Sequence, residues 1–273
     1  AAAAEAAAPP AVVAHRTAMQ HADILALAGL RVDGRLPNEI RCIKYAFGVL
    51  PRYDGSASLE MGLTKVMVAV SGPQEPIRRS DARHDRGFIT CSLHTAPFAG
   101  NERRRKRGAS DRRSTDLEAA IANTFSSAVI LSHYPRTQLH VIVHVLESDG
   151  GVLPACINAV SLALADAGVA TTDLVVACAA ARTADDRAVA DPSQLEQSAS
   201  SAYLPLAVLA RSQSVLLARM DARLSLDGVE EVLEAALEGC RRVHREMDAA
   251  VRDRVARRLA AAAPEGGGGG EEG

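Results

Sequence analysis

The stretch LHVIVHVLESDGGVLPACINAVSLALADAG, residues 139–168, decides the fold class. It opens with an apolar strand pattern over residues 139–146, which runs to the turn Asp149-Gly150-Gly151. An Ala- and Leu-rich helix that includes residues 158–166 follows, and Gly168 is placed to end it. A strand, a glycine turn and an apolar helix in direct succession predict a domain in which helices pack on sheets.

The residues before this stretch are patterned as strands. Alternation of apolar and polar residues and the turn dipeptide Asp54-Gly55 mark the first pair, and β-rich runs follow. The strands are predicted at residues 40–50, 56–60, 64–71 and 88–95.

A helix is predicted between the last of these strands and the opening stretch, over residues 115–133. Its apolar residues recur at helical spacing, and Ser114 or Thr115 can cap its N-terminus. Asp116 and Glu118 suit the positive end of its dipole.

After residue 168 the chain returns to strands and ends in a long amphipathic helix. Strands are predicted at residues 174–181 and 187–191, a hairpin at 204–209 and 214–220, and the helix from about 227 to about 258. Four strands, a helix, a strand, a helix, further strands and a final helix predict an α+β fold of mixed sheets with packed helices.

The composition sets the domain limits and the class of protein. An Ala-rich flexible extension is predicted for residues 1–27, a single domain for 28–260 and a Gly/Glu-rich disordered tail for 261–273. No apolar run approaches the roughly 20 residues of a membrane helix, so no membrane partner is expected. Five dispersed cysteines predict free thiols in a reducing compartment and no metal site.

The net charge of −2 hides a strongly basic segment. Residues 78–113 hold eleven Arg or Lys against four Asp or Glu, which leaves about −9 for the rest of the chain. Guanidinium groups match phosphate geometry, and the absence of interleaved aromatics favours contact with a nucleic acid backbone. A solvated surface loop or a localisation signal is the alternative. The candidate RNA-binding residues are Arg78, Arg79, Arg103, Arg104, Arg105, Lys106, Arg107 and Arg112.

Two further features could carry chemistry. The turn Asp149-Gly150-Gly151 precedes a helix, where backbone N–H groups can bind phosphate, although such a turn is more often only a turn. Asp185, Asp186 and Asp191 flank a short strand, and paired carboxylates can bind Mg²⁺ or transfer protons. Surface turns also collect Asp, and an acidic surface turn is the more common explanation of such residues.

Taken in order, the short motifs resemble those of the RNase PH subunits of the eukaryotic RNA exosome core. The resemblance spans residues 27–255 and is greatest to the eukaryotic version of the subunit that is catalytic in the archaeal ring. The motifs are residues 30–35 (LRVDGR) with Pro37, Glu39 and Arg41, then 54–57 (DGSA), 62–66 (GLTKV), 71–73 (SGP), 135–136 (PR), 149–151 (DGG), 163–168 (ALADAG) and 220–222 (MDA).

The resemblance implies the RNase PH fold, which belongs to the ribosomal protein S5 domain 2-like class. It also implies a ring of six such subunits around an RNA channel, with a cap of S1/KH subunits. Active members of the family cleave RNA from its 3′ end with inorganic phosphate as the nucleophile.

Only part of the family's phosphorolytic site matches this sequence. Arg113 corresponds to a phosphate-binding Arg, Gly151 to the Gly of the phosphate loop and Asp191 to the first of two Asp residues. Val152 and Leu153 stand where a Ser or Thr and an Arg are expected, and Gln197 stands in place of the second Asp. Arg113 and Gly151 are therefore a phosphate-binding remnant, and Asp191 and Asp185 are vestigial.

The resemblance therefore implies a non-catalytic ring subunit that lines the RNA channel and supports 3′-to-5′ processing and decay, including that of rRNA. Its expected partners are RNA, other RNase PH-type subunits, the cap and a hydrolytic exoribonuclease, in the nucleus, the nucleolus and the cytoplasm. No cofactor or metal is expected. One alternative is an active phosphate-dependent 3′-to-5′ exoribonuclease, which would need phosphate and Mg²⁺. The other is an RNA-binding protein that acts without a ring.

Overall fold

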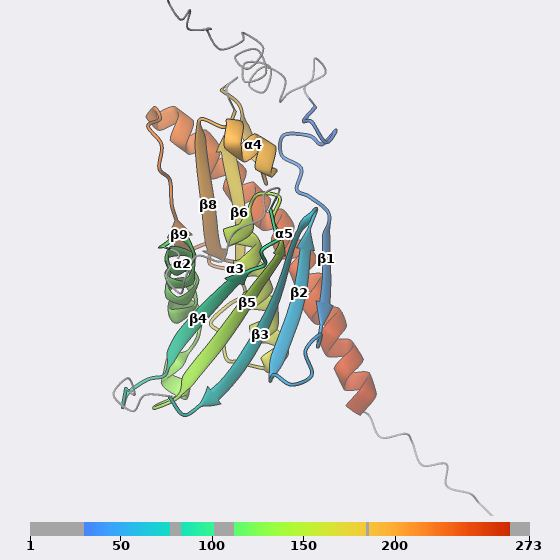
Figure 1. Cartoon of the computed structure of the whole chain (residues 1–273), viewed down its shortest axis with the longest axis vertical. Coiled ribbons are helices and arrows are strands. Elements are labelled where there is room, and N and C mark those ends of the chain that lie inside the picture. Colours follow the sequence, from blue (N-terminus) through green and yellow to red (C-terminus); the bar gives the residue numbers. More distant parts are fainter. Residues whose placement is uncertain (1–29, 77–82, 101–111, 184–185, 263–273) are drawn as a thin grey trace, which may run out of the picture.

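The computed structural model describes residues 30–76, 83–100, 112–183 and 186–262. Two sheets and the helices packed on them make up these residues (Figure 1). The strands are β1 Ile43–Phe47, β2 Gly55–Met61, β3 Thr64–Gln74, β4 Phe88–Thr95, β5 Gln138–Glu147, β6 Val175–Arg182, β7 Ala188–Ala190, β8 Ala202–Leu209 and β9 Val215–Ala218. The helices are α2 Arg112–Ala128, η2 Leu131–His133, α3 Val152–Ala167, α4 Gln194–Ala199 and α5 Leu226–Ala262.

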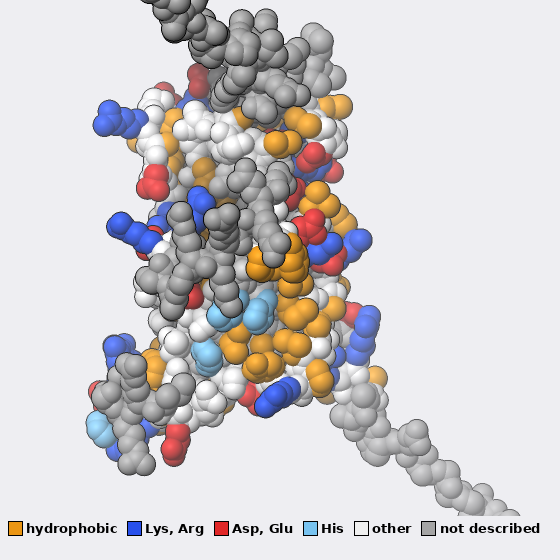
Figure 2. Space-filling view, viewed as in Figure 1, with side chains coloured by type: hydrophobic (Ala, Val, Ile, Leu, Met, Phe, Trp, Pro, Cys, Tyr) orange, Lys and Arg blue, Asp and Glu red, His pale blue; other side chains and the backbone are white. Residues whose placement is uncertain are grey.

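The first sheet has five strands in the order β1-β2-β3-β5-β4. Its neighbours are antiparallel except β4 and β5, which run parallel with Ile89 opposite Leu139. A parallel pair needs a crossover, and α2 supplies it. The inner face of this sheet packs on α2 and α3, while its outer face is turned toward the viewer in Figure 1. Figure 2 shows hydrophobic and histidine side chains on that outer face.

Helix α3 lies between the two sheets, which explains why its sequence is apolar on every side. Thirteen of its 16 residues are buried, and it contacts β2, β3 and β5 on one side and β6 and β8 on the other. Small residues permit the close approach, since a Cβ at Gly55 would lie 2.5 Å from the carbonyl oxygen of Ala163. Gly168 ends the helix in the left-handed conformation.

The second sheet has the order β7-β6-β8-β9 and is antiparallel throughout. Helix α5 covers the face opposite α3 and contacts β6, β7 and β8. Cys91, Cys156, Cys178 and Cys240 are buried, Cys42 is exposed, and all five are free thiols. No helix in the described part of the chain is long and apolar enough to cross a membrane.

The predicted α+β class and the order of the main elements are confirmed. The predicted helix over residues 115–133 is wrong at both ends, because α2 begins by Arg112 and ends at Ala128. Ser114 and Thr115 therefore lie inside its first turn and are not its N-cap. At the other end, Val129 bridges Thr171 and the Ile130 N–H donates to Ala170, so contacts with a distant segment end the helix. The short helix α4 was missed.

A buried amide joins α3 to the second sheet. Asn158 is 0% exposed, and its Nδ2 donates to the Ala177 carbonyl at 2.8 Å while its Oδ1 accepts from the Ala177 N–H at 2.7 Å. Strand β7 pairs with β6 only from Ala180 to Arg182. The Asn158 side chain thus gives Ala177 the two hydrogen bonds that a strand neighbour would otherwise provide.

Replacing this amide should destabilise the fold. Asn158→Ala leaves a buried N–H and a buried C=O without partners, and we expect it to lower the free energy of unfolding by about 2–4 kcal/mol. Urea denaturation followed by circular dichroism measures this. Ser161→Ala, one turn along the same helix, is the matched control and should cost less than half as much. Equal losses for the two variants would contradict the role of Asn158.

Candidate functional site

A cleft of about 720 Å³ opens between α2, the N-terminus of α3, the segment around α4 and the β8–β9 hairpin. Arg113, Val152, Leu153 and Gln197 line it, so the structure gathers four of the positions that the sequence singled out. Arg219, just beyond β9, also lines the cleft.

Arg113 enters the cleft from the first turn of α2. Its side chain is exposed, and Asp116, three residues further along the same helix, lines the cleft with it. Arg112 is also exposed at the start of α2. The other candidate RNA-binding residues, Arg78, Arg79 and residues 103–107, lie outside the described residues.

The N-terminus of α3 forms the back of the cleft. Gly151 is its N-cap and is left-handed at φ 60°, and a Cβ there would lie 2.9 Å from Nη2 of Arg41. The Gly151 N–H donates to Oε1 of Gln197 at 3.4 Å. An amide oxygen of the chain itself therefore lies at the position where the sequence placed an anion. Val152 and Leu153, the next two residues, are apolar and bring neither a hydroxyl nor a charge.

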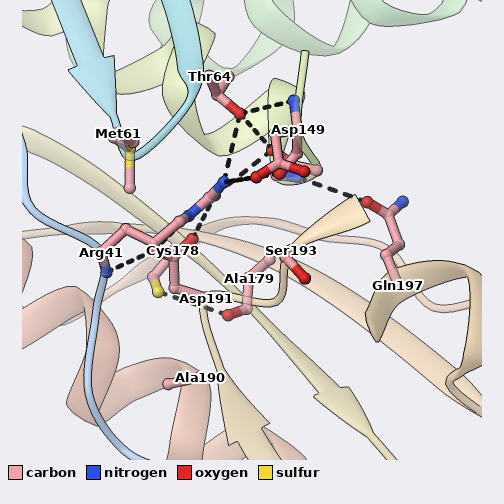
Figure 3. Close-up of polar contacts among 12 residues, drawn as sticks. Arg41, Met61, Thr64, Asp149, Cys178, Ala179, Ala190, Asp191, Ser193 and Gln197 are labelled. Atoms are coloured by element: carbon pink, nitrogen blue, oxygen red, sulfur yellow. Dashed lines mark hydrogen bonds and ion pairs between the residues drawn. The ribbon is translucent and has the colours of Figure 1, made fainter. Parts of the chain in front are cut away.

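Asp191 lies beside this turn but does not line the cleft. It is 2% exposed, and its carboxylate is bound by Arg41 (Figure 3). Nε and Nη2 of Arg41 donate to its two oxygens at 2.9 and 2.7 Å, and the Arg41 backbone N–H donates to Oδ2 at 2.9 Å. Burial alone would raise the pKa of the Asp191 carboxyl. The hydrogen bonds and charge of Arg41 outweigh it and hold this pKa below its ordinary value.

Arg41 connects Asp191 to the glycine turn. Its Nη1 donates to the carbonyl oxygen of Asp149 at 2.7 Å and to Oγ1 of Thr64 at 3.3 Å. The Thr64 hydroxyl in turn donates to the Gly150 carbonyl at 2.9 Å and accepts from the Asp149 N–H at 3.0 Å. One guanidinium therefore positions the turn, β3 and the segment after β7 relative to one another (Figure 3).

Asp186 and Asp191, the two described members of the acidic set, do not lie in one site. Asp186 is exposed and pairs with Arg182 at 3.2 Å, whereas Asp191, beyond the other end of β7, binds Arg41. Asp185 lies outside the described residues. Within the described ranges, no group of three or more His, Cys, Asp or Glu could hold a metal ion.

A second buried ion pair was not found from the sequence. Arg31 donates through Nε to Glu196 at 2.8 Å and through Nη1 and Nη2 to the carbonyl oxygens of Ala190 and Asp191. Glu196 also completes a capping box with Ser193 at the start of α4. The S-x-x-E pattern of residues 193–196 was the available signal. No local signal links Arg31 or Arg41 to partners 165 and 150 residues away.

Known proteins are similar in sequence to this chain along most of its length. The chain matches the "3′ exoribonuclease family, domain 1" over residues 39–170 and domain 2 of the same family over residues 173–239. It is 42% identical over 235 residues to the human "Exosome complex component RRP41", covering 85% of this chain and 95% of that protein. It is 38% identical over 226 residues to "Exosome complex component Rrp41" of the archaeon Methanopyrus kandleri, covering 83% and 93%.

Solved structures share the fold. Rice Rrp46 superposes with a TM-score of 0.72 at 24% identity, covering 81% of this chain and 100% of that one. A chain of the Archaeoglobus fulgidus exosome with RNA bound to the active site gives 0.69 at 23% identity, covering 85% and 99%. The predicted RNase PH fold is confirmed, and the chain belongs to the 3′ exoribonuclease family of RNase PH.

Proposed function

We propose that this chain is a ring subunit of an RNA exosome that guides RNA to an associated nuclease and has no phosphorolytic activity of its own. Relatives at about 40% identity along most of the chain are exosome components, which supports the ring. One observation carries the non-catalytic part. The N-terminus of α3, where the family site would hold phosphate, presents Val152 and Leu153, and the N–H of its N-cap Gly151 donates to Oε1 of Gln197.

The energetics favour loss of phosphate binding. Each charge-assisted hydrogen bond to an anion contributes roughly 1.5–3 kcal/mol, so a missing guanidinium and hydroxyl remove most of the affinity. The Gln197 oxygen accepts from the Gly151 N–H and competes for a donor that phosphate would use. Arg113 and Arg219 remain on the cleft wall, but neither takes the place of the missing guanidinium at the N-terminus of α3.

Asp191 is poorly placed to replace the missing chemistry. A carboxylate bound by one guanidinium and one backbone N–H in a buried site would have to break these bonds before it accepted a proton or a metal. Its lowered pKa also makes it a weak base. We assign Asp191 a structural role.

RNA guidance is supported by the positive charge of residues 78–113 and by the exposed Arg112 and Arg113 beside the cleft. The same proposal includes two kinds of partner, the S1/KH cap subunits and the hydrolytic nuclease. It also includes a nuclear, nucleolar and cytoplasmic location.

The competing function is phosphorolysis with groups borrowed from a neighbouring subunit. Arg113 and Arg219 in the open cleft favour it, because both could bind phosphate.

The first prediction separates these two functions. Purified chain, alone and in its assembled ring, should release no nucleoside diphosphate from single-stranded RNA when inorganic phosphate and Mg²⁺ are supplied. Thin-layer chromatography of end-labelled RNA measures the release, with a phosphorolytic archaeal exosome as the positive control. Phosphate-dependent release that Arg113→Ala abolishes would establish the competing function.

The second prediction concerns Asp191. Asp191→Asn leaves the Arg41 guanidinium buried without its counter-ion and should lower the free energy of unfolding by about 3–5 kcal/mol. Because the folded pKa of Asp191 is lowered, its stabilisation is present above the unfolded value of about 3.9 and is lost as pH falls through the folded pKa.

Urea unfolding between pH 3 and pH 7 tests both statements. The variant should lose part of the acid dependence of the wild type below about pH 4. Asp253→Asn on the exposed side of α5 is the control and should keep that dependence. A stable Asp191→Asn protein with the wild-type pH profile would show that the pair contributes little.

The third prediction concerns RNA. Replacing Arg103, Arg104 and Arg105 by Glu should weaken binding of the ring to single-stranded RNA and reduce the salt dependence of binding, since fewer counterions are released. Arg245, Arg252 and Arg257 on α5 are exposed, and their replacement by Glu makes the same change in charge elsewhere. Fluorescence anisotropy at several salt concentrations compares the two triple variants. Equal affinities and equal salt slopes would contradict the assignment.

A further inference from the structure

Phe98 is a large aromatic side chain that lies open to solvent. It is 73% exposed, and among the large hydrophobic side chains of the described residues only Leu226, at 74%, is as exposed. Tyr45 and Tyr53, the other exposed aromatic residues of the described ranges, reach 38% and 37%. A ring that buries so little surface does little to stabilise the fold, so its position calls for another explanation.

The backbone that carries Phe98 is held firmly. It lies in a β-turn in which the Ala99 N–H donates to the Ala96 carbonyl at 3.0 Å, and a proline, which fixes φ, follows Ala96. The turn is also tied to the end of β5. The Ala96 N–H donates to the Val145 carbonyl at 2.9 Å, and the Ser148 N–H donates to the Ala99 carbonyl at 2.7 Å. The exposed ring is therefore presented by a fixed turn.

This turn forms part of the rim of the cleft of about 720 Å³. Thr95, the last residue of β4, and Ala99 line the cleft on either side of Phe98 in the sequence. Arg113 and Arg219 line the same cleft. The structure thus combines one exposed aromatic ring at the rim with two guanidinium groups on the walls.

Positive charge beside an exposed aromatic ring is the composition of a site for single-stranded nucleic acid. Cationic groups follow the phosphates, and every base has a flat face that can stack on an aromatic ring. Residues 103–113 contain no aromatic residue, and Phe98 lies five residues before Arg103 in the sequence. Phosphate contacts hold a strand by its backbone only, so Phe98 supplies the contact to bases that the basic residues lack.

A protein partner fits the surroundings of Phe98 less well. The cores of protein interfaces are depleted in charged residues, because charges are costly to remove from water. The cleft at this rim is lined by Arg113, Asp116, Arg219 and Asp221. A strand of RNA brings its own charge and water to such a cleft, and it needs only one flat apolar surface for a base.

We propose that Phe98 is a stacking platform for one base of a single-stranded RNA at the rim of the cleft. This rests on the RNA-guiding function proposed above and adds a contact to the bases. Because all four bases have a π-face, the contact should tolerate any sequence. Because stacking releases no counterions, it should leave the salt dependence of binding unchanged.

Phe98→Ala tests the platform in the ring assembled from the full chain and the other RNase PH-type subunits. Fluorescence anisotropy of a labelled single-stranded RNA should show binding weakened by about fivefold to a hundredfold, the loss of one stacked base, with an unchanged salt slope. Phe98→Leu keeps an apolar side chain without a flat face and should lose nearly as much. Leu226→Ala, at an equally exposed residue, is the matched control and should bind as the wild type does.

An abasic strand of the same length separates stacking from other effects, since it keeps the phosphates and lacks the bases. It should bind the wild type and Phe98→Ala equally. A direct readout is available because the chain has no Trp. Phe98→Trp keeps a stacking face, and RNA, but not the abasic strand, should quench its indole fluorescence. The wild-type ring is the blank for tryptophans of the other subunits.

Equal weakening of both strands by Phe98→Ala would show a structural loss and overturn the stacking role. Unchanged RNA binding by this variant, in a ring whose binding depends on salt, would overturn it and leave the RNA function standing. Indole emission from Phe98→Trp that shifts to shorter wavelength on ring assembly and does not respond to RNA would assign the residue to a subunit contact, and would also overturn the proposal. A wild-type ring that binds no RNA would overturn the proposed function itself, and this inference with it.

Discussion

The buried ion pair between Arg41 and Asp191 fixes the position of the two sheets relative to each other. Removing both from water is costly, and the cost is offset only because every polar atom of the pair has a close partner. Arg41 comes from the segment before β1, Asp191 from the end of β7, and the other acceptors from the Asp149-Gly150-Gly151 turn. Geometry this specific places the N-terminus of α3, and hence the back of the cleft, relative to both sheets.

The sequence was informative wherever a local pattern determines local structure. Alternation of apolar and polar residues located the strands, and the apolar run ending at Gly168 located α3. Both signals can be read from the sequence because periodicity and a left-handed helix cap are properties of neighbouring residues. Prediction failed where contacts with a distant segment determine the local structure. Val129 and Ile130 continue the apolar pattern of α2, yet residues 170–171 draw the backbone out of the helix. The capping box at Ser193 was readable, but it opens a helix of only six residues.

In the candidate site, too, some features could be predicted from the sequence and others depend on contacts between distant residues. The four positions that the family motifs singled out, Arg113, Val152, Leu153 and Gln197, line one cleft, because motif positions carry three-dimensional information from relatives. They could not show that Gln197 accepts a hydrogen bond from Gly151, nor that Arg41 binds Asp191. Those contacts depend on side chains 46 and 150 residues apart. The cleft therefore combines a recognisable family position with local contacts that only coordinates reveal.

The position of α3 between two sheets has a consequence for how the protein opens. Amide protons in the middle of this helix should exchange with solvent only when one sheet separates from it, since both sides of the helix are covered there. Its exchange should therefore report global unfolding, whereas the exposed C-terminal turns of α5 exchange through local fraying. Because β2 and β6 rest on opposite sides of α3, the first sheet cannot open alone without exposing the apolar residues that also anchor the second. The two layers therefore form one cooperative unit.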